Sequence, residues 1–249
     1  MKKVMVVGAT SGTGRSVAYE LAKKQVGAIL VSRDHSKLDK LANDIRKLSP
    51  KSFFSTLSFD MRDTQDIESW IKNNEVLADV DSLVYCVGDG CLKKFKDLSY
   101  EDHLNSMKLC YFSFVELLRC LLNNRIDKKI QFNAVAISSV ASTNSNAKYF
   151  CPYVAAKSAL EGAVRVLSTE LIAKNCAVSA VKPGFIDTPR NEQYKLMHED
   201  VNGFLKKSGY QPGGMLSPDT VARLITFILE SQDMSFAGDI IPITAGALS

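Results

Sequence analysis

The stretch Val4-Met5-Val6-Val7-Gly8-Ala9-Thr10-Ser11-Gly12-Thr13-Gly14 decides the fold. Its three glycines permit a tight turn at Gly8, close approach of the backbone to a pyrophosphate at Gly12, and close helix–strand packing at Gly14. The helix that follows offers N–H groups and a partial positive charge to an anion. A glycine-rich turn can also bind nothing, but its place directly after a leading strand favours a dinucleotide site. The candidate contacts are Gly8, Thr10, Ser11, Gly12, Thr13 and Gly14.

Short apolar runs alternate with helical patterns along the rest of the chain. Strands are expected at residues 3–7, 28–32, 53–59, 82–86, 131–137, 177–181 and 239–243. Helices are expected at residues 13–24, 37–48, 64–74, 100–123, 151–174 and 220–230. The strands are continuously apolar, which is typical of a parallel sheet buried on both faces. We therefore predict an α/β fold, a Rossmann-type doubly wound sheet of seven parallel strands with helices on both faces.

No polar linker or internal repeat divides the chain, so we expect one dinucleotide-binding domain over residues 1–249. The one long interruption is residues 185–217, with a short helix expected near residues 192–207. A long excursion inside a compact domain is usually functional, and we expect a substrate lid there.

Composition excludes several classes of protein. The 249 residues are 46% hydrophobic and 23% charged, with a net charge of +4 and no basic block, so neither a nucleic-acid nor a membrane partner is expected. The N-terminus lacks a signal-peptide pattern, and no apolar run approaches the ~18 residues of a membrane helix. We therefore expect a cytoplasmic protein. The six cysteines and three histidines lack zinc-ligand spacing, so no metal is expected.

The end of the second predicted strand should meet the adenosine ribose of a dinucleotide. An acidic residue there would bind the 2′-hydroxyl of NAD, whereas an arginine suits the 2′-phosphate of NADP. Ser32 and Arg33 therefore favour NADP(H), with Arg15 near enough to help; the alternative is that Asp34 takes the acidic role. Asp60, after the third strand, either accepts from the adenine amino group or is a turn carboxylate.

Tyr153 and Lys157 lie four residues apart in a predicted helix and therefore share one face. An ammonium beside a phenol favours its ionised form, which lets a tyrosine exchange protons near neutral pH. The same spacing is common in ordinary amphipathic helices, so the pair gains meaning only from its surroundings.

Together these features resemble the classical short-chain dehydrogenase/reductase family, from Val4 to Gly246. The glycine turn resembles the family's T-G-x-x-x-G-x-G, with Val7 in place of threonine. The other matching segments are Ile137-Ser138-Ser139-Val140-Ala141, Tyr153-x-x-x-Lys157, Pro183-Gly184-Phe185-Ile186-Asp187-Thr188 and Gly238-Asp239-Ile240-Ile241 with Ala245-Gly246.

The resemblance implies hydride transfer between NADP(H) and a small-molecule carbonyl or alcohol, most simply by a ketoreductase. Tyr153 would be the general acid/base, Ser139 would bind the substrate oxygen, and Lys157 would hold the nicotinamide ribose and favour the tyrosinate. Ser139 is preferred because it precedes Val-Ala, and Ser138 is the alternate. Further cofactor contacts are implied at Gly88, Pro183, Gly184, Ile186 and Thr188.

The sequence departs from the family pattern in two places. The family's Asn-Asn-Ala-Gly is replaced by Tyr85-Cys86-Val87-Gly88, and the asparagine expected before the fifth strand is replaced by Cys110 or, in a nearby alignment, Lys108. The alternative hypothesis is therefore a catalytically weak or inactive NADP-binding sensor. A third hypothesis is an epimerase or dehydratase, but that branch of the family normally has longer chains than this one.

The resemblance also implies a homotetramer or homodimer that pairs through residues 100–123 and 151–174. The substrate is expected to be medium-sized and partly apolar. Its candidate contacts are Tyr149, Phe150, Phe185, Tyr194, Met197 and Phe204.

Overall fold

The computed structural model describes residues 3–88, 91–125, 129–143, 147–191, 200–231 and 233–247. Seven strands form one parallel sheet in the order β3-β2-β1-β4-β5-β6-β7. The strands are β1 (Lys3–Val7), β2 (Gly27–Ser32), β3 (Phe54–Ser58), β4 (Ser82–Tyr85), β5 (Phe132–Ile137), β6 (Cys176–Pro183) and β7 (Ile240–Ile243). The predicted seven-stranded, doubly wound sheet is confirmed, with strand boundaries within two residues of those expected.

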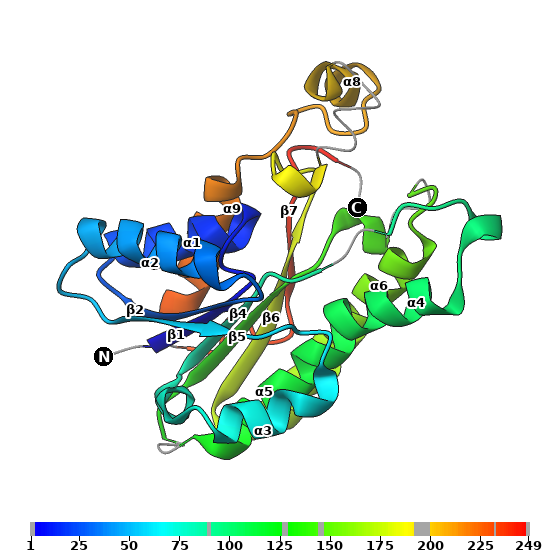
Figure 1. Ribbon diagram of the computed structural model, residues 1–249. Helices are drawn as coiled ribbons and strands as arrows, with labels where there is room; N and C mark the ends of the chain where they lie inside the picture. The colour runs from blue at the N-terminus through cyan, green and yellow to red at the C-terminus, as the bar shows by residue number, and fades with distance from the viewer. Residues whose placement is uncertain are drawn as a thin grey trace.

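Helices cover both faces of the sheet (Figure 1). One face carries α1 (Gly12–Lys23), α2 (His35–Leu48) and α9 (Pro218–Glu230), and the other carries α3 (Ile67–Lys72), α5 (Ser113–Asn124) and α6 (Cys151–Leu171). Alternate residues of β1 point to opposite faces, so Met5 joins one hydrophobic core and Val6 the other. This burial on both sides explains why the strands are continuously apolar.

The helix expected at residues 100–123 is not regular. It consists of α4 (Tyr100–Met107), a π-helical turn (Lys108–Phe112) and α5. Ser113 Oγ donates to the Lys108 carbonyl at 2.6 Å, and the hydroxyl of buried Tyr85 donates to the Leu109 carbonyl at 2.8 Å. These bonds serve carbonyls that a π turn removes from the regular ladder. Periodicity alone could not show this, because the partner Tyr85 lies on β4.

The excursion at residues 185–217 begins and ends at neighbouring points. Ile186 and Leu216 form a parallel bridge, with the Leu216 N–H donating to the Phe185 carbonyl at 2.8 Å. Between them lies α8 (Val201–Lys207), which Figure 1 shows beyond the ends of β6 and β7. The part of the expected helix at residues 192–199 lies outside the described residues. Within the described ranges, no helix combines the length and apolarity needed to span a bilayer.

Candidate active site

The glycine turn lies where strand order reverses, between β1 and its neighbours β2 and β4. Gly8 and Gly12 have φ of 82° and 49°, a region that favours glycine. A Cβ on Gly14 would collide with the Gly8 carbonyl oxygen and lie 2.8 Å from its carbon. Ser11 precedes α1 as its N-cap without a side-chain cap bond. The turn therefore fits a phosphate group approaching the start of α1.

Charged side chains gather just after the ends of β2 and β3. Ser32 shares a 2.8 Å hydrogen bond with Thr10, and the Arg33 side chain is 61% exposed. Arg62 binds the Asp60 carboxylate through Nε (3.1 Å) and Nη2 (2.6 Å), while Arg33 lies 3.7 Å from it. Partial burial opposes the ionised form, but the Arg62 hydrogen bonds and both cations lower the pKa of Asp60.

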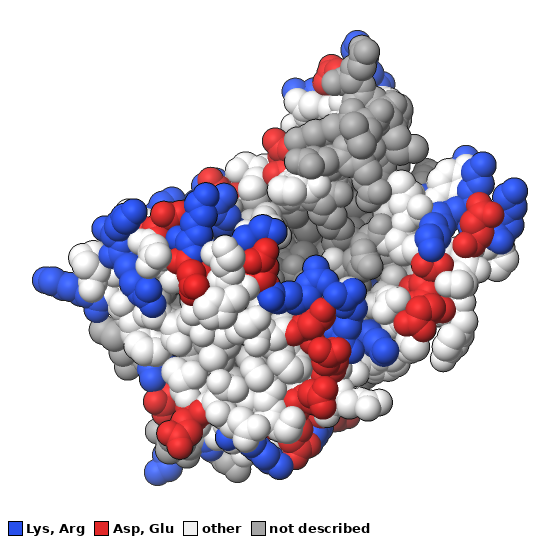
Figure 2. Space-filling view, in the orientation of Figure 1, with Lys and Arg blue, Asp and Glu red and all other residues white. Residues whose placement is uncertain are grey.

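Asp34 and Asp60 have structural roles at this end. Asp34 is the N-cap of α2 and accepts from the Lys37 N–H at 3.0 Å, a bond that lowers the pKa of Asp34. Asp60 also accepts from the Arg62 backbone N–H at 3.0 Å, as a turn carboxylate does. Arg62 was missed by the sequence analysis, although its partner Asp60 lies only two residues before it. Figure 2 shows basic and acidic residues interspersed over α1 and α2 on this side of the molecule.

Helix α6 supplies the expected tyrosine and lysine from its buried face. Pro152 in its first turn suits a helix start. Tyr153 lines the pocket, and Lys157 lies one turn further on, 1% exposed, with Nζ 5.8 Å from the centre of the tyrosine ring. Lys157 Nζ donates to the Ile137 carbonyl at 2.5 Å, which ties α6 to the end of β5. The structure thus places the two side chains together, as their spacing predicts.

The two adjacent serines after β5 have different surroundings. The backbone N–H of Ser138 donates to the Val181 carbonyl at 2.8 Å, and its buried hydroxyl donates to Glu161 at 2.6 Å. Ser139 has an extended backbone, lines the pocket with Tyr153, and accepts at Oγ from the Ala141 N–H at 3.2 Å. The bond from Ala141 uses a lone pair of the Ser139 oxygen and not its hydrogen, so the hydroxyl hydrogen can be donated to a substrate oxygen.

The two departures from the family pattern occur beside these groups. Cys110 lies in the π-helical turn, is fully buried, and packs in one apolar cluster with Tyr153 and Ala156. Cys86 lines the pocket; burial raises the pKa of its thiol to about 12 against the opposing charge of Lys157. The Cys86 thiol is therefore protonated at neutral pH and is not a nucleophile.

These walls enclose a pocket of about 510 Å³. Of the predicted contacts, it is lined by Ser11, Gly12, Thr13, Gly88, Ser139 and its alternate Ser138, Tyr153, Pro183, Gly184, Ile186 and Thr188. The other predicted contacts do not line it: Gly8, Thr10, Gly14, Ser32, Arg33, Asp60 and Lys157. Among these, Lys157 bonds to the carbonyl of Ile137, a lining residue.

The rest of the pocket lining is mainly apolar. Tyr149, Phe150, Phe185 and Phe204 line it as expected, whereas Tyr194 and Met197 lie outside the described residues. Leu92, Val201, Leu205 and Tyr210 were not predicted, because only the fold brings them to the site.

A buried glutamine joins the excursion to this wall. Gln211 donates to the Phe185 carbonyl at 3.0 Å and accepts from the Phe185 N–H at 2.7 Å. It also donates to the Gly214 carbonyl at 2.6 Å. One side chain thus holds the end of the excursion against the segment that follows β6, and sequence offers no signal for this contact.

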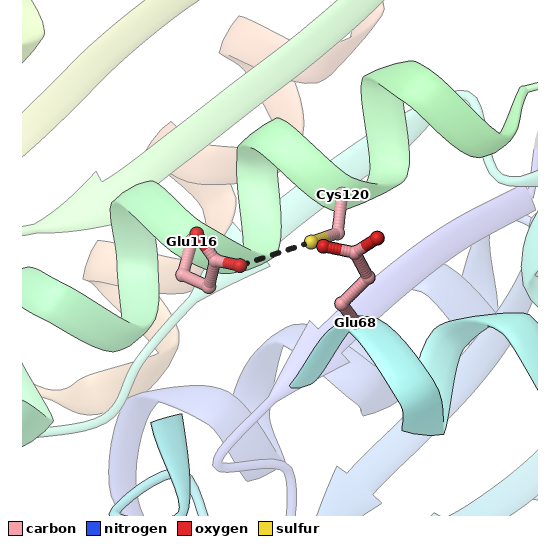
Figure 3. Close-up of side chains that lie close together, drawn as sticks. All are labelled: Glu68, Glu116 and Cys120. Atoms are coloured by element: carbon pink, nitrogen blue, oxygen red, sulfur yellow. Dashed lines mark hydrogen bonds between the residues drawn. The ribbon is translucent and has the colours of Figure 1, made fainter. Parts of the chain in front are cut away.

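A second group of chemically active side chains lies away from the pocket, where Glu68 of α3 meets Glu116 and Cys120 of α5 (Figure 3). Arg119 Nη2 lies 2.7 Å from Glu68 and 2.6 Å from Glu116, so a guanidinium already balances these carboxylates. Burial, followed by the contact with Glu116, raises the pKa of the Cys120 thiol to about 12. A protonated thiol is a poor metal ligand, and the geometry is that of an ion-pair network.

The sequence of residues 2–199 matches the family model for short chain dehydrogenases. The chain belongs to the short-chain dehydrogenase family. Among curated relatives, 3-ketodihydrosphingosine reductase of Mus musculus is 30% identical over 190 residues, 75% of this chain and 57% of that protein. The 3-oxoacyl-acyl-carrier-protein reductase of Rickettsia bellii is 24% identical over 248 residues, 98% of this chain and 95% of that protein.

The chain spans 57 to 66% of the length of its vertebrate relatives among these proteins. Its fold matches that of L-sorbose reductase from Gluconobacter frateurii, solved with NADPH and L-sorbose, with a TM-score of 0.88. That match covers 100% of this chain and 97% of the other at 21% identity, and it shows a shared fold.

Proposed function

We propose that the protein is an NADPH-dependent reductase of ketones. The observation that carries this proposal is that Ser139, Tyr153 and residues 11–13 of the glycine turn line the same pocket, with Lys157 buried one helical turn beyond the tyrosine. The turn residues, Pro183, Gly184, Ile186 and Thr188 would hold the dinucleotide. When bound, the nicotinamide supplies the hydride.

The remaining chemistry belongs to side chains of the chain itself. The Ser139 hydroxyl donates a hydrogen bond to the substrate carbonyl oxygen and orients it toward Tyr153. As the carbonyl carbon gains a hydride, Tyr153 gives its phenolic proton to the oxygen, which yields the alcohol. Lys157 favours the resulting tyrosinate by its positive charge until a proton from solvent restores the phenol.

The preference for NADP over NAD rests on the arginines beyond β2 and β3. Arg33 and Arg62 lie around Asp60, where two guanidinium groups suit a phosphate dianion. Asp34 caps α2, so its carboxylate is already engaged by a backbone N–H. Among the neighbours in fold, L-sorbose reductase was solved with NADPH.

The substrate we propose is a ketone on an apolar chain. The pocket wall away from the glycine turn carries Phe150, Phe185, Phe204 and Leu205, and Lys148 is its one charged member among the described residues. Desolvated apolar surface of this kind favours an aliphatic chain over a sugar. Two of the relatives are named as reductases of 3-ketodihydrosphingosine and of a 3-oxoacyl group.

The test uses the purified chain, NADPH and three probes: a series of methyl ketones of rising chain length, a 3-oxoacyl ester and L-sorbose. We expect NADPH oxidation with the first two, with kcat/KM rising along the ketone series. Tyr153→Phe should abolish turnover and leave NADPH binding unchanged. NADPH binding without turnover of any probe would contradict the proposal.

A second candidate function is that of a nucleotide-binding sensor without appreciable catalysis. Cys110 favours it, because a buried thiol packs against Tyr153 where the family pattern places an asparagine. Comparing the wild type with Cys110→Asn distinguishes the two. The reductase shows turnover with Cys110 in place, whereas a sensor that is inactive because of Cys110 would gain turnover only in Cys110→Asn.

We also propose that the chain assembles as a homodimer or homotetramer through α4–α5 and α6. Val166 on α6 is 56% exposed and Phe112 between α4 and α5 is 39% exposed, so each of these segments presents an apolar side chain that an interface could cover. Sedimentation of the full chain tests this. Val166→Lys should shift the protein toward monomer, and a wild-type monomer would refute the assembly.

A further inference from the structure

We infer that Glu161, together with Lys182, is a positioning residue that sets the turn carrying Ser139. The inference rests on the proposed function only for its kinetic consequence. Glu161 lies one turn beyond Lys157 and two beyond Tyr153, and all three are buried on one face of α6. The spacing was present in the sequence, but a glutamate in a helix is ordinarily solvated, so it did not point to a site.

Three groups converge on a single oxygen of Glu161. Oε1 lies 2.6 Å from Ser138 Oγ, 2.5 Å from Ser142 Oγ and 3.5 Å from Lys182 Nζ. The other oxygen, Oε2, lies 3.6 Å from Arg165 Nη2. Glu161 is 2% exposed, and such a carboxylate is held in a protein interior only when hydrogen bonds and opposite charges replace its water.

The convergence joins three segments that form the pocket. Ser138 and Ser142 flank Ser139 on the turn after β5, Glu161 belongs to α6, and Lys182 directly precedes Pro183 at the end of β6. Lys182 Nζ also donates to Thr143 Oγ1 at 2.8 Å. The same turn is held a second time by Ser158 of α6, whose hydroxyl donates to the Ser142 carbonyl at 2.9 Å.

The consequence for Ser139 follows from strand geometry. Successive side chains of an extended segment point to opposite sides. Because Glu161 holds the Ser138 hydroxyl, the next side chain, Ser139, is directed away from Glu161 and toward the pocket. Glu161 does not itself line the pocket, and it acts through its hydrogen bonds to Ser138, which does, and to Ser142.

The test compares Glu161→Leu, which removes the acceptor, with Glu161→Gln, which keeps an oxygen able to accept from both serines. Ser142→Ala removes one hydroxyl without leaving a charge unpaired, in case Glu161→Leu fails to fold. The matched control is Thr226→Val, which removes a buried hydroxyl that donates to its own helix on the opposite face of the sheet.

Two readouts are needed. Hydrogen exchange of the amides of residues 138–143 should be about tenfold faster in Glu161→Leu and Ser142→Ala, and unchanged in Glu161→Gln and Thr226→Val. With NADPH and a long-chain methyl ketone, kcat should fall about tenfold or more in the first two variants while the Kd for NADPH stays within about twofold. Glu161→Gln should retain most of the turnover.

Unchanged exchange at residues 138–143 in both Glu161→Leu and Ser142→Ala would overturn the inference. So would a Glu161→Gln variant as impaired as Glu161→Leu, since charge rather than hydrogen bonding would then be required. If the wild type turns over no ketone, the proposed function fails, and the exchange readout still decides whether Glu161 positions the turn.

Discussion

The wall of the pocket at residues 8–14 is made of backbone, whereas the wall at α6 and the ends of β5 and β6 is made of buried side chains. In the first, a missing Cβ creates the shape, as the collision of a Gly14 Cβ with Gly8 shows. In the second, Lys157, Glu161 and Lys182 bond across elements far apart in sequence. We therefore expect the backbone wall to be disrupted by substitutions that add atoms, and the side-chain wall by substitutions that remove polar atoms.

The largest effect is expected at Lys157, in the side-chain wall. Lys157→Met removes the ammonium beside Tyr153 and the donor to the Ile137 carbonyl. We expect turnover of ketones to fall about 10²–10⁴-fold, the usual contribution of acid–base catalysis. Lys174→Met, an exposed lysine just after α6, is the control. Equal turnover in the two variants would show that the buried ammonium has no catalytic role.

The next effect tests the backbone wall. Gly14→Ala adds one carbon against Gly8, and overpacking of this kind costs about 1–3 kcal/mol of unfolding free energy. The affinity for NADPH should fall with it. Gly162→Ala is the matched control, because a Cβ there meets no atom within 4 Å, and it should stabilise the protein by about 0.4–1 kcal/mol. Thermal unfolding measures the stability of both variants, and NADPH titration measures their affinity for the cofactor. A Gly14→Ala variant with unchanged stability and unchanged NADPH affinity would refute this account of the backbone wall.

A smaller effect is expected where the excursion joins the wall. Gln211→Leu leaves the Phe185 N–H and carbonyl without their side-chain partner, at a cost of about 1–3 kcal/mol. Because Phe185 lines the pocket, KM for the ketone should rise more than kcat falls. Ser208→Ala, which removes an exposed hydroxyl from the same excursion, should change neither. A fall in kcat at constant KM would contradict this role for Gln211.

The smallest effect is expected at Glu68, which is drawn in Figure 3 and pairs with Lys72 and Arg119. Hydrogen bonds from Lys72 and Arg119 lower the pKa of Glu68 from 4.5 to about 2. A lowered folded-state pKa stabilises the fold above pH 4.5 and loses that contribution as the pH falls toward 2. Glu68→Gln should therefore show a flatter loss of stability over this range, measured by denaturant titration, with Glu75→Gln as control. An unchanged slope would show that these bonds do not persist in solution.

The sequence predicted the backbone wall more fully than the side-chain wall. Glycines at positions 8, 12 and 14 indicate their own conformations, and apolar periodicity indicates the strands and helices. Ser139, Tyr153 and Lys157 were identified through spacing and family resemblance, and the structure brings them together. By contrast, Gln211 and Lys182 gave no local signal, because their partners Phe185 and Glu161 are distant in sequence.

The sequence by itself determined the seven-stranded doubly wound sheet, the glycine turn and the tyrosine–lysine pair, since each depends on residues a few positions apart. Only the tertiary structure decided that Glu161 holds the hydroxyl of Ser138 rather than that of Ser139, and that Cys110 packs against Tyr153. The physical reason is that the periodicity of apolar residues indicates which face of a helix or strand a residue occupies. What it meets there depends on strand order, register and the packing of elements distant in sequence.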